Sequence, residues 1–272
     1  MNETLTRLLS GIVYIVLLLS AISYSTTSFF ILFGVFLLIA LNEFCNLVKI
    51  SKIAPFFVGI IIYYYFTFGE INERNIVNVT LVIALLISIK AIFFLFSKEI
   101  KSCSTIDKYL FTLGYIILSF VFITKIPFGI SGYNPKIIIG IFILIWTNDT
   151  FAYIVGKSIG KNKLFERISP KKTIEGFLGG LVFSILAGIL ISKYFIGSSS
   201  MSTMYIWIGI AFIACIFGTI GDLVESKFKR IAQVKDSGNI MPGHGGVLDR
   251  LDSIIFVAPF VYLFYQILYY VS

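Results

Sequence analysis

The chain has 272 residues, of which 58% are hydrophobic and 13% are charged. Soluble globular domains carry about 25% charged residues, so this composition excludes a soluble domain and indicates a polytopic membrane protein. The formal net charge of +8 does not indicate nucleic-acid binding, because the basic residues lie in short segments between apolar runs rather than in a separable arm or tail.

Nine apolar runs follow one another along the chain. A helix needs about 20 apolar residues to cross the bilayer core, and runs near this length cover residues 8–24, 26–42, 53–69, 76–96, 109–124, 137–156, 174–196, 204–225 and 253–271. We therefore expect an all-α polytopic integral membrane protein with about nine transmembrane helices. The first run lacks the charged start and cleavage site of a secretory signal, so it is expected to remain as a span.

The basic residues divide unequally between the two sides that alternating spans define. Eighteen of the 22 Lys and Arg residues lie in the N-terminal segment or near residues 49–52, 90–108, 157–172 and 227–250, and the other four are Arg74, Lys125, Lys136 and Lys193. Cytoplasmic loops carry the positive excess. The sequence therefore predicts a cytoplasmic N-terminus, cytoplasmic loops around Lys163 and Asn239, and an external C-terminus at Ser272.

The two halves of the chain differ in polarity. Residues 1–133 are expected to be apolar helices with a structural role, whereas the predicted cytoplasmic loops of residues 134–272 combine glycine with basic and acidic residues. Glu43 near the end of the second run can mark function, since an ionisable group in a membrane is costly, but an interfacial carboxylate is the favoured interpretation. The cysteines are isolated and odd in number, which indicates packing rather than a disulfide or zinc site: Cys45, Cys103 and Cys215.

The first polar block covers residues 147–180. Asp149, Tyr153 and Lys157 follow one another at intervals of four residues, so they share one face of a helix. The glycines at 156 and 160 would let a neighbouring helix or a substrate approach closely.

The same block contains two adjacent lysines after a proline. Ser169 and Pro170 predict the start of the next helix, because proline is tolerated in a first turn. Lys171 and Lys172 would then lie at the positive N-terminal end of that helix and form an anion site. The alternative is that lysines in this block serve only the positive-inside signal, which is the favoured interpretation for Lys161 and Lys163.

A second polar helix end carries Asp222, Glu225 and Ser226, whose spacing places them in one stripe below an apolar helix. Gly218 and Gly221 are interpreted as helix-packing positions, as small residues commonly are in membranes. Asp222 is a candidate metal ligand, because it ends a span on the side that also carries the two aspartates described next.

The segment 226–252 is the most informative part of the sequence. Its glycines and Pro242 make a long helix improbable, since glycine costs about 1 kcal/mol and proline about 3 kcal/mol in a helix interior. Asp249 and Asp252 then open the last apolar run three residues apart, on one face of a helix. Mg2+ typically takes one or two carboxylates plus substrate phosphates, and loop glycines can bring N–H groups to those phosphates. Helix capping by these acids is the alternative.

This segment resembles the C-terminal signature of the phosphatidate cytidylyltransferases, also called CDP-diacylglycerol synthases. Their pattern runs Ser-x-apolar-Lys-Arg, Lys-Asp, Pro-x-His-Gly-Gly and Asp-Arg-apolar-Asp. The chain matches it at Ser226, Lys229, Arg230, Lys235, Asp236, Pro242, His244, Gly245, Gly246, Asp249, Arg250 and Asp252. Met241 stands where a branched aliphatic residue is expected, which is a conservative departure. Residues 147–180 also resemble a second region of this family.

The resemblance implies transfer of a cytidylyl group from CTP or dCTP to phosphatidate, which gives CDP-diacylglycerol and pyrophosphate. It implies a homodimer in a bacterial plasma membrane, with an interface formed by residues 1–133. Residues 134–272 would be the catalytic half, with the active site on the cytoplasmic face and no nucleic-acid partner. Mg2+ is the implied cofactor, with a second cation allowed, and Asp222, Asp249 and Asp252 are the expected ligands, Asp249 foremost.

Further roles follow from the same resemblance. Lys171, Lys172 and Arg250 would clamp phosphates, and Asn148 with Asp149 would complete the nucleotide or metal site. Phosphate contact or loop ordering is favoured over base catalysis for His244, because a phosphate monoester with a second pKa of about 6 is already ionised at neutral pH. The remaining expected substrate contacts are Ser226, Lys229, Arg230, Lys235, Asp236, Gly245 and Gly246.

Two other functions remain open from the residues themselves. A lipid-alcohol kinase would use similar substrates but release a nucleoside diphosphate and a phosphorylated lipid. A cation-coupled transporter would place its acids near the middle of the membrane and show related halves, whereas the acids here gather at one predicted face.

Overall fold

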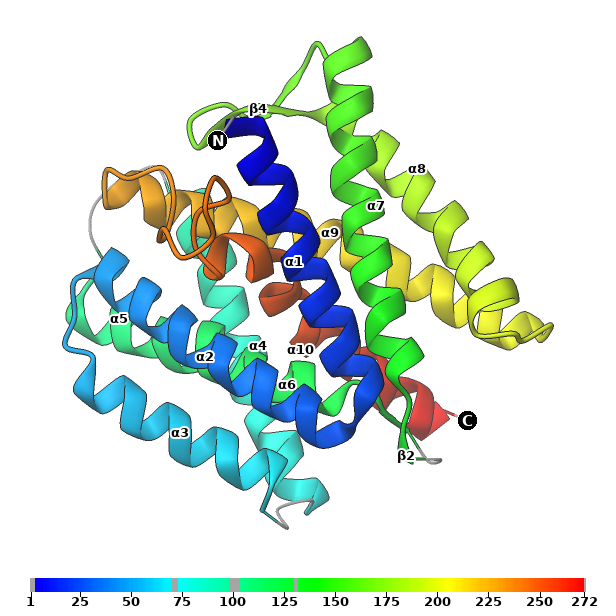
Figure 1. Ribbon diagram of the computed structural model, residues 1–272, viewed down its shortest axis with the longest axis horizontal. Helices are drawn as coiled ribbons and strands as arrows, with labels where there is room; N and C mark the ends of the chain where they lie inside the picture. The colour runs from blue at the N-terminus through cyan, green and yellow to red at the C-terminus, as the bar shows by residue number, and fades with distance from the viewer. Residues whose placement is uncertain (1–2, 70–72, 98–102, 130–131, 272) are drawn as a thin grey trace.

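The computed structural model describes residues 3–69, 73–97, 103–129 and 132–271. It is a bundle of helices with two short antiparallel hairpins (Figure 1). The first part contains α1 (Glu3–Tyr24), α2 (Thr26–Val48), α3 (Ile53–Thr67), α4 (Arg74–Phe96), α5 (Thr105–Phe111), η1 (Thr112–Leu118), α6 (Ser119–Lys125), β1 (Phe128–Gly129) and β2 (Gly132–Tyr133). The second part contains α7 (Pro135–Ile159), β3 (Lys163–Phe165), β4 (Ser169–Thr173), α8 (Ile174–Leu190), η2 (Ile191–Phe195), α9 (Met201–Ile231) and α10 (Leu248–Val271).

Within the described residues, eight helical segments are long and apolar enough to cross a membrane. The predicted run 53–69 is instead the 15-residue helix α3, which at 1.5 Å per residue extends about 22 Å, less than the ~30 Å of a bilayer core. The helical membrane class is therefore confirmed, while the count of nine spans stays a prediction. Lys98 and Lys101 of the predicted basic segment 90–108, and Ser272, lie outside the described residues.

The first two spans are separate helices joined by a one-residue turn at Ser25. The Ser25 hydroxyl accepts a hydrogen bond from the Ser28 N–H at 3.0 Å, and the Ser28 hydroxyl accepts one from the Ser25 N–H at 3.0 Å. This reciprocal pair is a capping box, which satisfies N–H groups that the start of a helix otherwise leaves free. This turn separates the two predicted runs 8–24 and 26–42.

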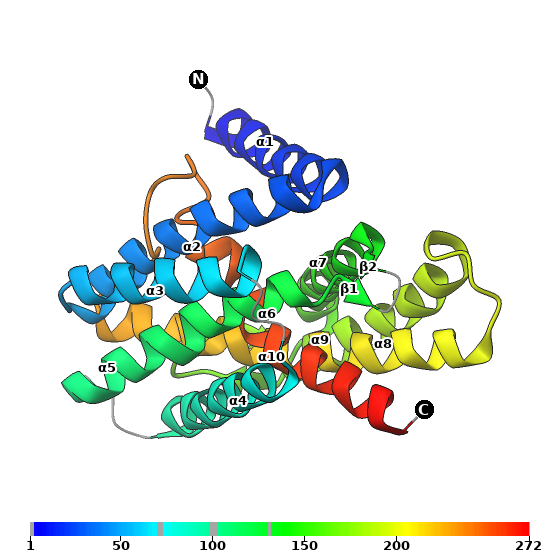
Figure 2. The same cartoon turned by 90° about the horizontal axis from the view of Figure 1, so that it is seen from below.

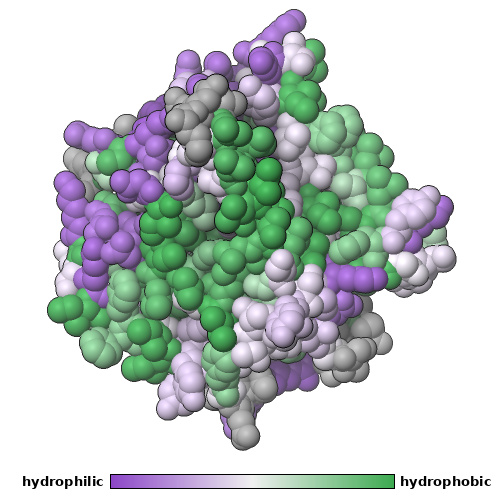
Figure 3. Space-filling model, in the orientation of Figure 1, coloured by the Kyte–Doolittle hydropathy of each residue, from purple (hydrophilic) through white to green (hydrophobic). Residues whose placement is uncertain are grey.

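The outer surface of the bundle is strongly apolar. Many large hydrophobic side chains of α1, α3, α4 and α8 are exposed, and hydrophobic residues cover much of the face seen in Figure 3. Figure 2 shows α1 at the outer edge of the molecule, beside α2. A continuous apolar exterior of this extent is expected where lipid, rather than water, surrounds the helices.

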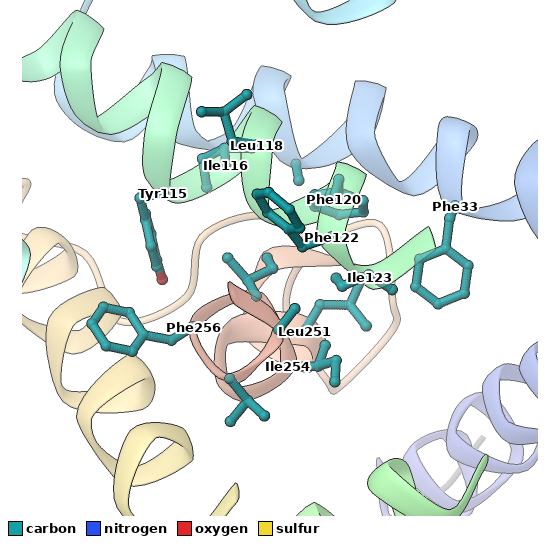
Figure 4. Close-up of a cluster of buried hydrophobic side chains, with 14 of the residues drawn as sticks. Phe33, Tyr115, Ile116, Leu118, Phe120, Phe122, Ile123, Leu251, Ile254 and Phe256 are labelled. Atoms are coloured by element: carbon teal, nitrogen blue, oxygen red, sulfur yellow. The ribbon is translucent and has the colours of Figure 1, made fainter. Parts of the chain in front are cut away.

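The start of α10 lies at the centre of the bundle. Its buried residues Leu251, Ile254 and Phe256 pack among aromatic and aliphatic side chains of α2, η1 and α6, including Tyr115 and Phe120 (Figure 4). This core fixes the direction in which α10 leaves the loop that precedes it.

Close helix crossings at glycine position the polar residues. A Cβ atom on Gly221 of α9 would lie 2.7 Å from the Asp252 carbonyl oxygen of α10, and one on Gly176 of α8 would lie 2.6 Å from the Ala152 carbonyl oxygen of α7. The packing interpretation of Gly221 is thereby confirmed. Gly156 also contacts α8, since its Cβ would lie 3.5 Å from the Gly176 Cα.

The predicted helix start at Ser169 and Pro170 is wrong. Residues Ser169–Thr173 form strand β4, which pairs with β3, and α8 begins at Ile174. The reason is the cap: the Thr173 hydroxyl accepts a hydrogen bond from the Gly176 N–H at 3.1 Å, so Thr173 rather than Ser169 ends the extended segment. Lys171 and Lys172 therefore lie in a strand, where neighbouring side chains point to opposite faces.

Candidate active site

Three aspartates from three helices gather where α7, α9 and α10 meet. They are Asp149 of α7, Asp222 of α9 and Asp252 of α10, and each carboxylate lies within electrostatic reach of the other two. The close crossing of α9 and α10 at Gly221 produces this arrangement. Asp149, Asp252 and the neighbouring Asp249 line a cavity of about 350 Å³.

Lys172 of β4 neutralises part of this negative charge. Its ammonium Nζ lies 2.6 Å from Asp222 Oδ2, and the Ser226 hydroxyl donates to Asp222 Oδ1 at 3.1 Å. Burial alone would lower the pKa of Lys172, but the charge of Asp222 outweighs it and raises that pKa above its ordinary value. Lys172 is therefore a permanent cation of the site, whereas Lys171 is exposed on the opposite face of the strand.

Lys229 forms a second charged cluster beside the first. Its ammonium lies 2.8 Å from Glu225 Oε2 and 2.6 Å from Asp249 Oδ1. The other oxygen of Asp249 accepts from the Ser237 N–H at 2.8 Å, the Ser237 hydroxyl at 2.9 Å and the Gly246 N–H at 2.8 Å. The Asp249 carboxylate is thus held by four donors, and its side chain is only 6% exposed. Only Lys229 contacts Oδ1, so a metal bound by that oxygen would share it with the ammonium group.

Glu43 of α2 is part of the same assembly. Its side chain is buried, with a residue exposure of 2%. It accepts hydrogen bonds from the N–H groups of Val247 at 3.1 Å and Leu248 at 2.8 Å, and from the Ser237 hydroxyl at 3.1 Å. Glu43 is thus buried inside the bundle, where α2 carries it against N–H groups at the start of α10, and its position at the membrane interface stays a prediction. An acidic residue in an apolar run is energetically costly, and this cost was the sequence signal that could have identified Glu43 as a site residue.

His244 and Arg250 organise the glycine-rich loop. His244 Nδ1 lies 2.7 Å from the Ser10 hydroxyl of α1, and Arg250 donates to the His244 carbonyl oxygen through Nε at 3.2 Å and Nη2 at 3.0 Å. Gly243 and Gly245 adopt φ angles of 75° and 83°, which side chains rarely tolerate. Burial, with the charges of Arg250 and Arg7, lowers the pKa of His244 below its usual range, so the ring is neutral at neutral pH.

A second cavity lies on the outer side of this loop. It measures about 470 Å³, and basic residues from two distant segments line it: Arg7 of α1 with Lys235 and Arg250. Asp236 and Gly245 line it as well. His244 and Arg250 line both cavities, so the loop separates them.

Several predicted residues lie away from the cavities. Arg230 donates to the carbonyl oxygens of Ile168 at 3.4 Å and Val234 at 3.5 Å, which ties the β3–β4 hairpin to the end of α9. Asn148 is buried against α8, where its Oδ1 would lie 2.5 Å from a Cβ on Gly180. Gly246 is buried behind the loop, and a Cβ there would lie 2.4 Å from Glu43 Oε2.

The N-terminal helix supplies residues that sequence reasoning missed. Ser10, Gly11, Tyr14 and Ile15 of α1 line the 350 Å³ cavity, and the Tyr14 hydroxyl is buried without a hydrogen-bond partner. Nothing in an apolar run distinguishes such positions, because only the folded bundle brings α1 against the loop.

The carboxylate chemistry fits a hard divalent cation. Such ions prefer oxygen ligands, which Asp149, Asp222 and Asp252 supply. Across the described part of the chain, no three His, Cys, Asp or Glu side chains form a ready-made metal site. A cation at the three aspartates would compete with Lys172 for Asp222, since that ion pair already occupies one carboxylate oxygen.

Fold and site together indicate a multi-helix membrane protein that acts on phosphate-bearing substrates. The chain matches the model of the cytidylyltransferase family over residues 5–268, and it belongs to that family. The phosphatidate cytidylyltransferase of Bacillus subtilis (strain 168) is 34% identical over 266 residues, which cover 94% of this chain and 95% of the relative.

Two staphylococcal relatives match over a shorter stretch. The phosphatidate cytidylyltransferases of Staphylococcus aureus (strain COL) and Staphylococcus haemolyticus (strain JCSC1435) are 52% identical over 120 residues and 50% identical over 118 residues. Each match covers 43% of this chain and 44% of the relative. The family predicted from the signature in residues 226–252 is confirmed.

Proposed function

We propose that this chain transfers the cytidylyl group of CTP to phosphatidate, giving CDP-diacylglycerol and pyrophosphate. Membership of the cytidylyltransferase family over residues 5–268 supports it, as does the match over 94% of the chain to a phosphatidate cytidylyltransferase. The observation that carries it is the meeting of three carboxylates and Lys172 beside a cavity with one apolar wall.

The two cavities suit the two substrates. Apolar side chains of α1, α7 and α10 line the 350 Å³ cavity next to Asp149 and Asp252: Ile15, Phe142, Ile145, Trp146 and Ile254. An amphipathic phosphatidate, with its phosphate at the aspartates and its acyl chains along the apolar wall, matches this lining. The 470 Å³ cavity, with Arg7, Lys235 and Arg250, suits the triphosphate of CTP, because basic side chains bind phosphates through charge-assisted hydrogen bonds.

The reaction joins the substrates where the cavities adjoin. A phosphate oxygen of phosphatidate attacks the α-phosphorus of CTP, the bond from that phosphorus to the bridging oxygen of the β-phosphate breaks, and pyrophosphate leaves. Lys172 and Arg250 would hold and neutralise phosphate oxygens, since such transfers depend mainly on positioning and electrostatics. His244, neutral and hydrogen-bonded to α1, would order the loop, because an ionised phosphate needs no base.

Mg2+ is the proposed cofactor, held by Asp222 and Asp252 with Asp149. When bound, it would neutralise phosphate charge and orient the reacting groups. Asp249, held by Lys229, Ser237 and Gly246, would serve the site by ordering the loop. This assignment differs from the sequence-based expectation that Asp249 is the foremost ligand, and the two can be separated experimentally.

The proposed location is a bacterial plasma membrane with the site on the cytoplasmic face. The 18-to-4 division of basic residues supports a cytoplasmic N-terminus and an external C-terminal end. We further propose a homodimer whose interface is formed by the apolar helices of residues 1–133.

The decisive experiment measures CTP-dependent pyrophosphate release by the purified protein with phosphatidate in detergent, together with CDP-diacylglycerol by mass spectrometry. Equal amounts of the two products are expected, and neither should form without phosphatidate. Release of CDP or ADP with a phosphorylated lipid alcohol would instead establish a kinase. If neither reaction is detected and the protein drives cation-coupled solute uptake in vesicles, the protein is a transporter.

A further inference from the structure

Glu43 connects the N-terminal half to the loop before α10. The carboxylate accepts N–H hydrogen bonds from Val247 and Leu248, which lie 204 and 205 residues further along the chain. These groups belong to the start of α10, where the N–H groups of a first turn have no partner within the helix. A buried carboxylate is favourable at this position because the N-terminal end of a helix carries partial positive charge.

The same carboxylate also holds the other end of the loop. The Ser237 hydroxyl lies 3.1 Å from Glu43 Oε2 and 2.9 Å from Asp249 Oδ2. It has a single proton, so the two carboxylates share this donor. Cβ atoms on Gly238 and Gly246 would lie 2.5 Å and 2.4 Å from the Glu43 carboxylate oxygens. Glycine at both positions therefore allows Glu43 to contact both segments of the loop.

Glu43 shares the task of fixing this loop with Asp249, which accepts from Ser237 and Gly246, and with Arg250, which donates to the His244 carbonyl oxygen. Between the end of α9 at Ile231 and the start of α10 at Leu248 there is no helix or paired strand, apart from a single bridge between Met241 and Gly245. Glu43 lines neither of the two cavities beside the loop. Its effect on a reaction there must pass through the residues that it holds.

We propose that Glu43 is a positioning residue for cytidylyl transfer: from α2, it fixes the loop 237–248 and the first turn of α10, so that Arg250 and Asp252 stand opposite Asp222 and Lys172. This inference rests on the proposed function and adds to it a residue outside the signature segment. Mutating a group that hydrogen-bonds to a metal ligand typically costs 10- to 100-fold in metal affinity or activity, and a misplacement of about 1 Å far from the chemistry can cost about 100-fold in rate.

The primary test substitutes Glu43→Gln, which keeps the size of the side chain. The amide has one acceptor oxygen where the carboxylate has two, and its NH2 group faces N–H donors. We expect kcat for cytidylyl transfer to fall by roughly 10- to 100-fold, with much smaller changes in the apparent KM for CTP and phosphatidate. Hydrogen exchange followed by mass spectrometry should become faster in peptides covering 237–248 and unchanged in α4 and α8.

Two further variants sharpen the test. Glu43→Asp keeps the charge but shortens the reach, so it should recover part of kcat and of the exchange protection; it also carries the test if Glu43→Gln does not fold. Asn42→Ala is the matched control, because Asn42 adjoins Glu43 but accepts a hydrogen bond from the exposed Lys52 at 2.7 Å. This control should keep wild-type kcat and wild-type exchange in the loop.

The outcomes are distinct. The proposal would be overturned if folded Glu43→Gln kept both wild-type hydrogen exchange in residues 237–248 and wild-type kcat. If Glu43→Gln does not fold, the same result in Glu43→Asp would overturn it. A uniform rise in exchange over all helices, with rate loss that follows the loss of folded protein, would also overturn it in favour of a general structural role. If the wild type itself shows no cytidylyl transfer, the proposed function fails, while the exchange measurement still decides whether Glu43 holds the loop.

Discussion

Replacing Asp249 and Asp222 separately by asparagine distinguishes a loop-holding carboxylate from a metal ligand. Asp249→Asn removes one of the two carboxylates that contact the buried Lys229 ammonium and leaves Glu225 as its remaining acidic partner. The new amide NH2 group would also face a hydrogen-bond donor, which it cannot satisfy. Removing one partner of a fully buried ion pair costs about 3–5 kcal/mol, and hydrogen bonds to charged groups contribute about 1.5–3 kcal/mol each. Because Lys229 keeps Glu225, we expect the free energy of unfolding to fall by about 2–4 kcal/mol.

Asp222→Asn should behave differently. The Lys172 side chain that it leaves behind is 27% exposed, so water can solvate the ammonium, and the loss of a partly exposed pair costs about 1 kcal/mol or less. If Asp222 binds Mg2+, the loss of metal-assisted charge neutralisation should cost several kcal/mol in the transition state. This corresponds to a rate loss of roughly 10³-fold at 1.36 kcal/mol per decade, together with a higher Mg2+ requirement.

The assay measures cytidylyl transfer across a Mg2+ titration and the midpoint of thermal unfolding in detergent for both variants. Asp249→Asn should lower the midpoint and turnover without changing the Mg2+ concentration at half-maximal rate. A wild-type midpoint together with a raised Mg2+ requirement in Asp249→Asn would refute the four-donor argument and restore Asp249 as the metal ligand. Turnover above about a tenth of wild type at limiting Mg2+ in Asp222→Asn, a loss under about 1.4 kcal/mol, would remove Asp222 from the metal site.

Three further predictions use other parts of the structure. Lys172→Ala should lower kcat and raise the apparent KM for CTP or phosphatidate, because a cation at the phosphates stabilises ground and transition states alike. Lys163→Ala, at an exposed strand residue, should change neither kcat nor KM. Small and equal effects of the two substitutions would assign both lysines to membrane insertion. The pKa of His244 is lowered in the folded state, so the unfolded chain binds more protons than the folded one between that pKa and about 6.5. The wild type should therefore lose stability relative to His244→Gln as pH falls through that window, and parallel unfolding curves would contradict a neutral His244. In a background without native cysteines, an impermeant thiol reagent applied to intact cells should label a cysteine at Ser199 and not one at Asn239, and the reverse pattern would invert the proposed orientation.

The sequence alone determined the class of fold. Each span must be apolar and long enough to cross the bilayer, and both properties can be read from the sequence. It also identified most of the charged residues around the cavities: the segment 226–252 and Asp149 lie where polar groups gather. The separation of the runs 8–24 and 26–42 and the close approach at Gly221 were expected as well, since they depend on neighbouring residues or on residue size.

Tertiary structure decided which partner each charge takes. Lys172 lies in a strand and pairs with Asp222, because Thr173 rather than Ser169 caps α8. The spacing of Asp249 and Asp252 places them on one helix face, but only the folded loop surrounds Asp249 with four donors.

Glu43 and α1 illustrate the limit most clearly. An acid in an apolar run is a signal of cost, but its partners at Val247 and Leu248 lie more than 200 residues away. Ser10 and Tyr14 carry no signal at all, since their position at the cavity arises only when α1 packs against the loop. Local sequence patterns indicate that a residue requires burial, a hydrogen bond or an opposite charge, whereas the packing of distant helices decides which group provides it.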